Sequence, residues 1–339
     1  MIQAIMTEPG NIIFVDAPIP DVKSNQIKVR IMRIGVCGSD VHVNHGKHPY
    51  TSYPVVQGHE VSAQVVEVGS AVTTVVIGDK VTIQPQVVCG KCYPCIHGMY
   101  NVCENLKVMG FQTTGMASEF FVTEAIKALK LPANMSWDNG AMIEPLAVAV
   151  HALGRYGSVR EKNILVLGGG PIGNLVAQTA KANGASKVLL SELSEYRLEI
   201  AKKCGIETVN PSQNDLKVAM LNCFGTDGAD AIFECVGING TLKQAIENAR
   251  KGSDIIVVGV FGDLGLINMG YIQDHELRLI GTAMYREEDY MKAIELVREN
   301  LIDLDALVTK HVKFKDYPDA YQIIDEQKDK VMKVMINME

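Results

Sequence analysis

The sequence lacks the features of several classes of protein. It contains no apolar run long enough to cross a bilayer, and residues 1–8 show neither the charged nor the apolar region of a signal peptide. Lys and Arg number 32 against 39 Asp and Glu, so the net charge of −7 offers no basic patch to nucleic acid or to an anionic membrane. We therefore expect a cytoplasmic protein that binds neither nucleic acid nor membrane.

Disulfide bonds are also not expected. A chain without an export signal is predicted to stay in a reducing compartment, where its eight cysteines are better suited to metal ligation. Internal repeats, low-complexity tracts and long linkers are missing as well. A length of 339 residues is enough for two domains, each with its own core.

What the sequence does contain is a glycine-rich turn in a suitable context. Residues 164–167 are a short apolar run that predicts a buried strand, and Gly168, Gly170 and Gly173 follow it in the pattern G-x-G-x-x-G. Small residues allow a sharp turn and a close approach of the backbone to a pyrophosphate. The pattern alone is weak, because ordinary βα turns are often rich in glycine.

The segments after the turn favour a nucleotide site over an ordinary turn. A helix is expected over residues 172–183, with Gly184 as its left-handed terminator. A second strand is expected over residues 187–191 and ends in an acid, Glu192. The free amides at the start of such a helix attract phosphate. The sequence therefore predicts one half of a Rossmann fold with a dinucleotide site.

The rest of the chain has two patterns. The first hundred or so residues are predicted to be rich in β-strand, and residues 137–154 to be helical with a break or kink at Pro145. Further strands are expected over residues 231–235, 255–260 and 278–281, alternating with helices, and this alternation predicts a parallel sheet covered on both faces. An amphipathic helix after residue 287, a strand near 312–314, a short helix and a last strand over 331–336 complete the prediction.

Four cysteines lie close together in one loop. Cys89, Cys92, Cys95 and Cys103 have the spacing C-x2-C-x2-C-x7-C, and four thiolates can surround one Zn²⁺ tetrahedrally. A pair of disulfides or an iron–sulfur cluster are the alternatives. The expected compartment disfavours the first, and the missing Cys-Pro of the ferredoxin pattern disfavours the second. We predict a structural zinc site, which has no position left for a substrate.

A second possible metal site is scattered along the chain. Cys37 lies in the segment G-V-C-G-S-D-V-H, His59 and Glu60 in G-H-E, and Glu144 in I-E-P. One thiol, one imidazole and one or two carboxylates suit a zinc site with an open position. Each residue alone is poor evidence, because Cys37 could be a core residue and either acid an ordinary surface group.

These segments together carry a resemblance. Their order, with the four-cysteine loop, G-G-G-P-I-G, Glu192 and the segment E-C-V-G at residues 234–237, resembles the zinc-containing medium-chain alcohol/polyol dehydrogenases of the sorbitol, threonine and butanediol dehydrogenase group. The resemblance implies a GroES-like, partly open β-barrel catalytic domain over residues 1–150, completed by 287–339. It also implies a Rossmann domain with a doubly wound parallel sheet over residues 151–286.

The resemblance further implies roles at the scattered site. Cys37 and His59 would bind a catalytic zinc ion, with Glu60 or Glu144, or water held by one of them, completing its coordination. Two zinc ions per chain are therefore expected. Ser39 would contact the substrate oxygen, and His42 would be the next station of a proton relay. Without the surrounding motif, Ser39 would be read as a turn residue and His42 as a histidine at a helix end.

Cofactor contacts follow from the same resemblance. Ile172 would lie beside the pyrophosphate, Glu192 and Arg197 at the adenosine end, and Val258 and Val260 along the nicotinamide. An acid at the end of the second strand accepts hydrogen bonds from ribose hydroxyls, which predicts NAD in preference to NADP. Arg197 could equally be a solvated helix charge.

The expected function is therefore transfer of a hydride between NAD and a secondary alcohol, in a polyol, sugar acid or small diol. A homodimer or homotetramer is also expected. A zinc-free quinone or enone reductase with the same two-domain plan is the alternative enzyme. A non-catalytic protein that only binds a dinucleotide is a further alternative, and metal content separates the three.

Overall fold

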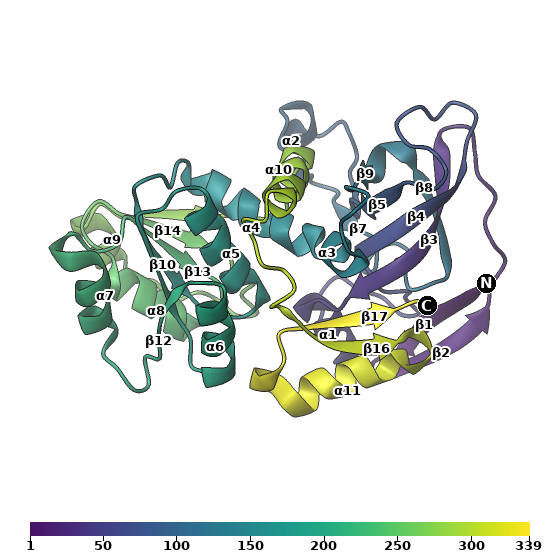
Figure 1. The fold of residues 1–339 in the computed structure, drawn as a ribbon. Helices are drawn as coiled ribbons and strands as arrows, with labels where there is room; N and C mark the ends of the chain where they lie inside the picture. The colour runs from purple at the N-terminus through teal and green to yellow at the C-terminus, as the bar shows by residue number, and fades with distance from the viewer. The chain divides into compact units, whose positions relative to one another are not determined.

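The computed structural model describes residues 1–339 (Figure 1). Contacts between residues divide the chain into two units. Unit 1 comprises Met1–Glu144, Arg286–Ile294 and Val308–Glu339, and unit 2 comprises Pro145–Tyr285 and Glu295–Leu307. The chain therefore leaves unit 1, forms most of unit 2 and returns, so that both termini belong to unit 1. None of the helices combines the length and apolar character that a membrane span requires.

Unit 1 is built on a seven-stranded, mostly antiparallel sheet around β3 (Gln26–Gly35). One edge of β3 pairs with β4 (Glu60–Val68), and the other edge pairs with β8 (Phe120–Glu124) and then with β17 (Lys333–Asn337). Two shifts of register occur between β3 and β4. Such bulges bend a strand and increase its twist, which allows one long strand to serve three partners. The remaining strands of the sheet are β5 (Lys80–Ile83), β9 (Ala128–Lys130) and β16 (Val308–Lys313).

Smaller elements complete unit 1. Strands β1 (Ile2–Glu8) and β2 (Asn11–Asp16) form a hairpin, and β6 (Gln86–Val87) pairs with β7 (Lys107–Val108). The helices are α1 (Gly38–Asn44), α2 (Tyr93–Ile96), α3 (Trp137–Ala141) and α11 (Tyr317–Gln327), and the short 3-10 helices include η1 (Tyr100–Val102). Alternate residues of β3, among them Ile27, Val29 and Ile31, face a core that also takes in Tyr317 and Tyr321 of α11. The apolar alternation of β3 thus directs one face of the sheet inward.

Unit 2 contains a parallel six-stranded sheet in the order β12-β11-β10-β13-β14-β15. This order is that of a doubly wound Rossmann sheet. From β10 to β12 each strand is added toward one edge, and from β13 to β15 toward the other edge, so the strand order reverses between β10 and β13. The strands are β10 (Asn163–Leu167), β11 (Lys187–Ser191), β12 (Glu207–Val209), β13 (Ala231–Glu234), β14 (Asp254–Val257) and β15 (Arg278–Gly281). Ligands of such sheets bind at the carboxyl ends of the strands beside the point of reversal.

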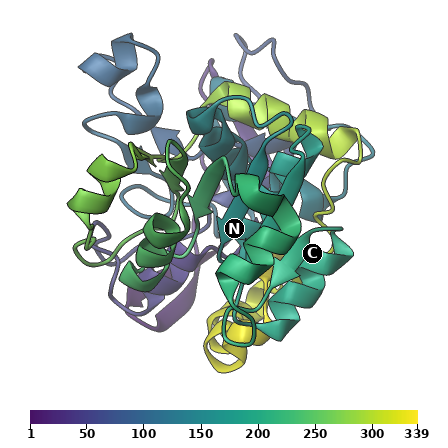
Figure 2. The same ribbon diagram turned by 90° about the vertical axis from the view of Figure 1, so that its left-hand side faces the viewer.

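Helices cover both faces of this sheet (Figure 2). Leu165 and Leu167 of β10 pack in one core with residues of α7 and α8, whereas α5 packs on β10 and β11 from the other side. Two further helices, α4 and α10, each contain a boundary between the units. The helices are α4 (Ile143–Tyr156), α5 (Pro171–Ala182), α6 (Glu195–Lys203), α7 (Leu216–Phe224), α8 (Asn239–Asn248), α9 (Met269–Asp274) and α10 (Glu287–Arg298).

The predicted fold class is confirmed, with local differences. The strand expected near 312–314 spans Val308–Lys313, and the last strand, expected over 331–336, spans Lys333–Asn337. Strand β12 was not predicted, because its three residues contain no apolar run. Strand β14 ends at Val257, so Val258 and Val260 lie in the loop after it and not in a strand. The helical break lies at Met142, and Pro145 sits in the first turn of α4. A proline is tolerated there because the first-turn amides have no partner within the helix.

Candidate functional site

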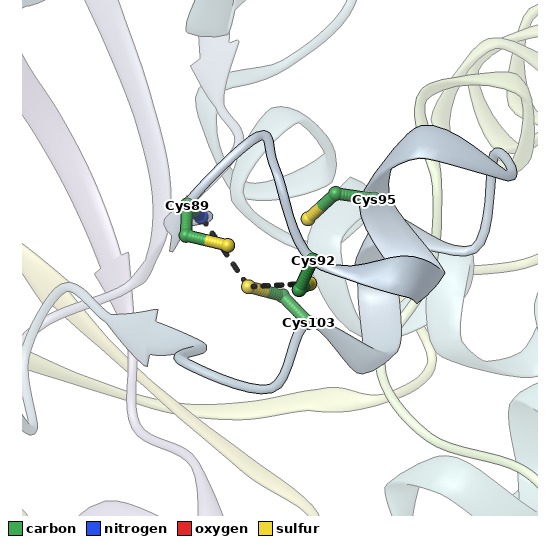
Figure 3. Close-up of side chains that lie close together, drawn as sticks. All are labelled: Cys89, Cys92, Cys95 and Cys103. Carbon is green, nitrogen blue, oxygen red and sulfur yellow. Dashed lines mark hydrogen bonds between the residues drawn. The ribbon is translucent and has the colours of Figure 1, made fainter.

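The four-cysteine loop brings its sulfurs together in unit 1. The Sγ atoms of Cys89, Cys92, Cys95 and Cys103 all lie within 4.8 Å of one another and point inward (Figure 3). Cys92 precedes α2, Cys95 lies in it, and Cys103 follows η1. The backbone amides of Cys89 and Asn105 donate to Cys103 Sγ at 3.3 and 3.4 Å. All four are free thiols, so the disulfide alternative does not describe this geometry.

The electrostatics of this loop fit a divalent cation. Backbone N–H groups, that of Lys91 foremost, lower the pKa of Cys89 to about 6, whereas burial raises the pKa of Cys95. Two thiolates about 4 Å apart repel by about 4 kcal/mol at an effective dielectric near 20. Four of them need a central positive charge, and a tetrahedral zinc ion supplies it.

A second group of possible metal ligands forms at the junction between the end of β3 and the start of α1. The register pairs Gly35 of β3 with Glu60 of β4, so that Cys37, two residues further on, meets His59 and Glu60. The donor atoms of these three residues lie within 4.8 Å of one another. His59 and Glu60 are buried, and Cys37 is half-buried. The antiparallel pairing of β3 and β4 therefore builds this site from residues that are distant in the sequence.

Two neighbours make room for Glu60 and neutralise it. A Cβ atom on Gly35 would lie 2.2 Å from Glu60 Oε2, so only glycine leaves space for the carboxylate. Lys333 of β17 donates to both carboxylate oxygens, at 2.7 and 2.6 Å, and to Val36 O at 3.1 Å. Both partners are almost fully buried, at 3% exposed for Lys333 and 1% for Glu60. A buried charge pair of this kind needs such complete hydrogen bonding.

A chain of polar side chains lies behind His59. Asp40 Oδ1 is 3.5 Å from His59 Nδ1, which makes no hydrogen bond of its own. Burial is the largest single influence and lowers the pKa of His59, but the charges and hydrogen bonds of Asp40 and Cys37 together outweigh it and raise the pKa well above its ordinary value. Asp40 Oδ2 accepts from the Cys37 amide at 2.9 Å, and Gln57 Nε2 donates to Asp40 Oδ1 at 3.3 Å. The Tyr321 hydroxyl donates to Gln57 Oε1 at 2.6 Å.

The structure places the remaining predicted residues of this site separately. Ser39 and His42 lie three positions apart in α1, a spacing that puts them on one side of a helix. Ser39 is half-buried and His42 is exposed. Glu144 is buried in the first turn of α4 and lies outside the group of three donors, although its charge acts on Lys333.

The glycine-rich turn has the close contacts that its sequence predicts. Gly168 adopts a φ of 99°, in the left-handed region that favours glycine. A Cβ atom on Gly173 would lie 1.8 Å from Gly168 O, so the start of α5 packs directly on the turn. Gly170 is the N-cap of α5, and Ile172 lies in its first turn. Gly184, with a φ of 84°, follows the helix as predicted.

Glu192 is tied to this turn. Its Oε2 accepts from the Gly169 amide at 2.7 Å, and its Oε1 accepts from the amides of Leu193 and Ser194 at 2.7 and 2.9 Å. Arg197 Nη1 lies 3.8 Å from Glu192 Oε2. Glu192 and Arg197 therefore lie together beside the glycine turn.

The ends of the next two strands meet beside the turn. Glu234 is fully buried at the end of β13, and its Oε1 accepts from the amides of Val236 and Gly237, both at 2.9 Å. The backbone of Val260 approaches Gly237 so closely that a Cβ atom there would lie 2.4 Å from Val260 O. Val258 is half-buried, and Val260 is 85% exposed.

Comparison with known proteins identifies the family. Residues 23–133 match the model of the alcohol dehydrogenase GroES-like domain, and residues 171–299 match that of the zinc-binding dehydrogenases. A 2-dehydro-3-deoxy-L-galactonate 5-dehydrogenase from Pseudoalteromonas atlantica is 34% identical over 304 residues, covering 89% of each chain. The chain belongs to the zinc-type alcohol dehydrogenase family. The resemblance noted from the sequence is thereby confirmed.

Solved structures of this dehydrogenase family have the same fold. A zinc-binding dehydrogenase from Sinorhizobium meliloti, bound to NADP, gives a TM-score of 0.90 at 29% identity and covers 99% of this chain and 98% of its own. An Escherichia coli protein described as a short chain alcohol dehydrogenase, complexed with NADH, gives 0.92 at 28% identity and covers 100% and 99%. The two neighbours carry different nicotinamide cofactors, so the family alone does not decide between NAD and NADP.

The sequence did not point to several side chains around the dehydrogenase site. Asp40 lay within a recognised motif, but no role was expected for it. For Lys333 the sequence offers one indication, because a lysine is unusual inside an apolar terminal strand. Gln57 and Tyr321 carried none, because their contact joins residues that are 264 positions apart.

Proposed function

We propose that this dehydrogenase interconverts a secondary alcohol, in a polyol, sugar acid or small diol, and its ketone, with NAD as the hydride carrier. The carrying observation is the group of Cys37, His59 and Glu60, whose donor atoms lie within 4.8 Å of one another beside Ser39. A thiol, an imidazole and a carboxylate are the ligands of an open, catalytic zinc site. The sugar-acid substrate in the name of the Pseudoalteromonas relative supports the substrate class.

Cys37 and His59 would hold the catalytic zinc ion, and Glu60 or Glu144, or water held by either, would complete its coordination. When bound, zinc supplies Lewis acidity at the substrate oxygen and the nicotinamide accepts the hydride. Ser39 Oγ takes the proton of the substrate hydroxyl and passes it toward His42. Because His42 is exposed, its ring can release that proton to solvent. Cys89, Cys92, Cys95 and Cys103 would bind a second, structural zinc ion.

The cofactor contacts are proposed for unit 2. The turn of Gly168, Gly170 and Gly173 and the first turn of α5 around Ile172 would receive the pyrophosphate, since free helix amides attract phosphate. Val258 and Val260 would contact the nicotinamide half. Glu192 would accept a hydrogen bond from a ribose hydroxyl. A 2′-phosphate near this carboxylate would cost about 4 kcal/mol per pair of unit charges, although Arg197 offsets part of the repulsion.

Three broader features belong to the same proposal. The catalytic domain would span residues 1–150 and 287–339, and the Rossmann domain 151–286. A homodimer or homotetramer is supported by β15, an edge strand whose outer backbone groups can pair with a second chain. A cytoplasmic location is supported by eight cysteines that are all free thiols.

The test is a substrate and cofactor panel with metal analysis. Purified protein is assayed for zinc and then for oxidation of polyols, sugar acids and diols with NAD⁺ and NADP⁺, in wild type and in Glu192→Ser. We expect two zinc ions per chain, oxidation of at least one of these alcohols, and a strong preference for NAD⁺ that narrows in the variant.

Other outcomes are equally decisive. One zinc ion per chain with no turnover favours a protein that only binds a dinucleotide. A protein without zinc that reduces quinones or enones favours the reductase. Equal use of NADP⁺ with Glu192 intact shows that this acid does not face the ribose.

A further inference from the structure

His48, a histidine near the candidate zinc site, has no role in the function proposed above. His48 follows α1, and its ring stacks on Phe111 with 4.7 Å between centroids and 11° between planes. The other neighbour of Phe111 is His59, whose ring centroid is 4.9 Å away. The charges of Asp40, His42 and His59 all act on His48. His48 is therefore one aromatic ring away from a proposed zinc ligand and near the proposed proton relay.

The His48 ring is held in one orientation. Its Nδ1 lies 2.8 Å from Thr51 Oγ1, and the edge of Tyr50 approaches it with 6.2 Å between centroids. Phe111 is buried, whereas His48 is only half-buried. With Nδ1 engaged by Thr51, Nε2 is the ring nitrogen that remains to contact a bound molecule. Burial, the largest influence, lowers the pKa of His48 and so favours the neutral imidazole.

We propose that His48 determines substrate specificity by hydrogen-bonding, through Nε2, a second hydroxyl group of the substrate beside the reacting carbon. This inference rests on the proposed function and narrows it to alcohols with neighbouring hydroxyls. A pocket that provides a hydrogen bond to a hydroxyl discriminates against analogues that lack it, because the pocket's polar atom is then left unpaired. A neutral imidazole binds a substrate hydroxyl better than a substrate carboxylate, because the ring carries no positive charge to neutralise the carboxylate.

A purely packing role makes a different prediction. A ring that only fills space against Phe111 would be replaced without loss by phenylalanine, which keeps the stacked geometry. The Thr51 contact would then have no consequence for the substrate. The two roles therefore separate when the same enzyme is offered a diol and its mono-hydroxyl analogue.

The experiment compares wild type with His48→Phe on such a substrate pair, for example 2,3-butanediol and 2-butanol. We expect kcat/KM for the diol to fall about fivefold, mainly through KM, since a net hydrogen bond contributes about 1 kcal/mol and each 1.4 kcal/mol is tenfold. The value for the mono-alcohol should change less than about twofold. His48→Gln should recover part of the loss, because its amide restores a hydrogen-bonding group.

Two further variants guard the interpretation. His45→Phe is the matched control, since His45 is exposed, lies three residues earlier and pairs with Asp325 at 2.9 Å. This control variant should leave kcat/KM unchanged for both substrates. Thr51→Val keeps His48 but frees its ring, and should give an intermediate loss on the diol alone. This variant decides the matter if His48→Phe folds poorly or loses zinc.

An equal loss on both substrates, or no loss on either, overturns the proposed role of His48 while the proposed function stands. A wild type with two zinc ions that oxidises no alcohol in the panel instead refutes the proposed function, and this inference with it. Zinc content and unfolding midpoint are measured for every variant, so that damage to the metal site is recognised as such.

Discussion

The two groups of metal-type ligands in unit 1 are built in opposite ways. Cys89, Cys92, Cys95 and Cys103 supply four sulfurs from a single loop, and no apolar side chain between them is buried. Cys37, His59 and Glu60 come from two paired strands, and the lysine that neutralises Glu60 lies 273 positions away in the chain. The loop contains its whole site in a short sequence. The other site exists only after the sheet has formed.

This difference predicts what each metal does. In the loop, binding of zinc replaces a hydrophobic core, so its free energy is folding free energy. At the second site, the apolar core of β3 and β4 already fixes the ligands. Loss of its zinc ion should therefore unfold the loop, whereas loss of the zinc ion at the second site should abolish catalysis without unfolding the protein. Four substitutions, ordered by expected effect, test this contrast.

The largest effect is expected from Cys37→Ser. Turnover should fall at least about a thousandfold, because Lewis-acid activation is worth several kcal/mol and about 4 kcal/mol corresponds to that factor. The unfolding midpoint and the affinity for NAD should hardly change, since the glycine turn belongs to unit 2. Zinc content, steady-state rates and a fluorescence titration with the dinucleotide check these points. Alcohol oxidation at near wild-type rate in a variant lacking this zinc ion would refute the zinc mechanism.

Cys95→Ser should show the reverse pattern. We expect loss of one zinc ion per chain and a fall in the unfolding midpoint of about 6 °C, which corresponds to about 4 kcal/mol for a chain of this size. The rate per folded molecule should stay within about threefold. Cys204→Ser is the control, since this thiol belongs to neither group. Unchanged stability after loss of the zinc ion would argue against a scaffold role.

Lys333→Met sharpens the contrast from the other side. Removing the lysine leaves Glu60 buried and unpaired, which should destabilise the protein by about 3 kcal/mol. Chemical unfolding of wild type, Lys333→Met, Glu60→Gln and the double variant measures the coupling. The double variant should regain most of the loss, because it contains no uncompensated buried charge. Single and double variants of equal stability would mean that Lys333 contributes packing and no charge pairing.

The same contrast explains how far the sequence could lead. Strands β11 and β15 were predicted with the right bounds, because glycine and polar residues punctuate short apolar runs. The structural cysteines were visible from spacing alone. The scattered site needed the resemblance to a family, since nothing local indicates that Gly35 and Glu60 are paired in a sheet.

Contacts between residues that only the strand topology brings together could not be predicted from the sequence. Lys333 looked like an interruption of an apolar strand, and only the pairing of β17 with β3 shows that it faces Glu60. The role of Asp40 depends on its distance from His59, which no sequence pattern provides. Glu60 and Glu144 are both buried acids whose charges act on Lys333, and only the structure shows that Glu60 is the one that lies with Cys37 and His59.

The smallest effect concerns the polar chain behind His59. Tyr321→Phe removes one hydrogen bond and leaves the carbonyl oxygen of Gln57 without that donor, which should cost about 1 kcal/mol of stability. Because Gln57 in turn positions Asp40, the variant should also bind the catalytic zinc ion a few-fold more weakly in competition with a chelator. Groups directly behind a metal-binding histidine change affinity by about 10–100-fold, and this group is two steps further away.

Tyr53→Phe separates positioning from simple loss of a hydrogen bond. The Tyr53 hydroxyl donates to the backbone oxygen of Val43 in α1 and has no path to His59 through Gln57. Both variants should lose similar stability, but only Tyr321→Phe should weaken zinc binding. Equal zinc affinity in the two variants would show that the polar chain stabilises the fold without positioning the ligand. The scattered site would then depend on its two strands and Lys333 alone, and the influence of α11 would end at the core.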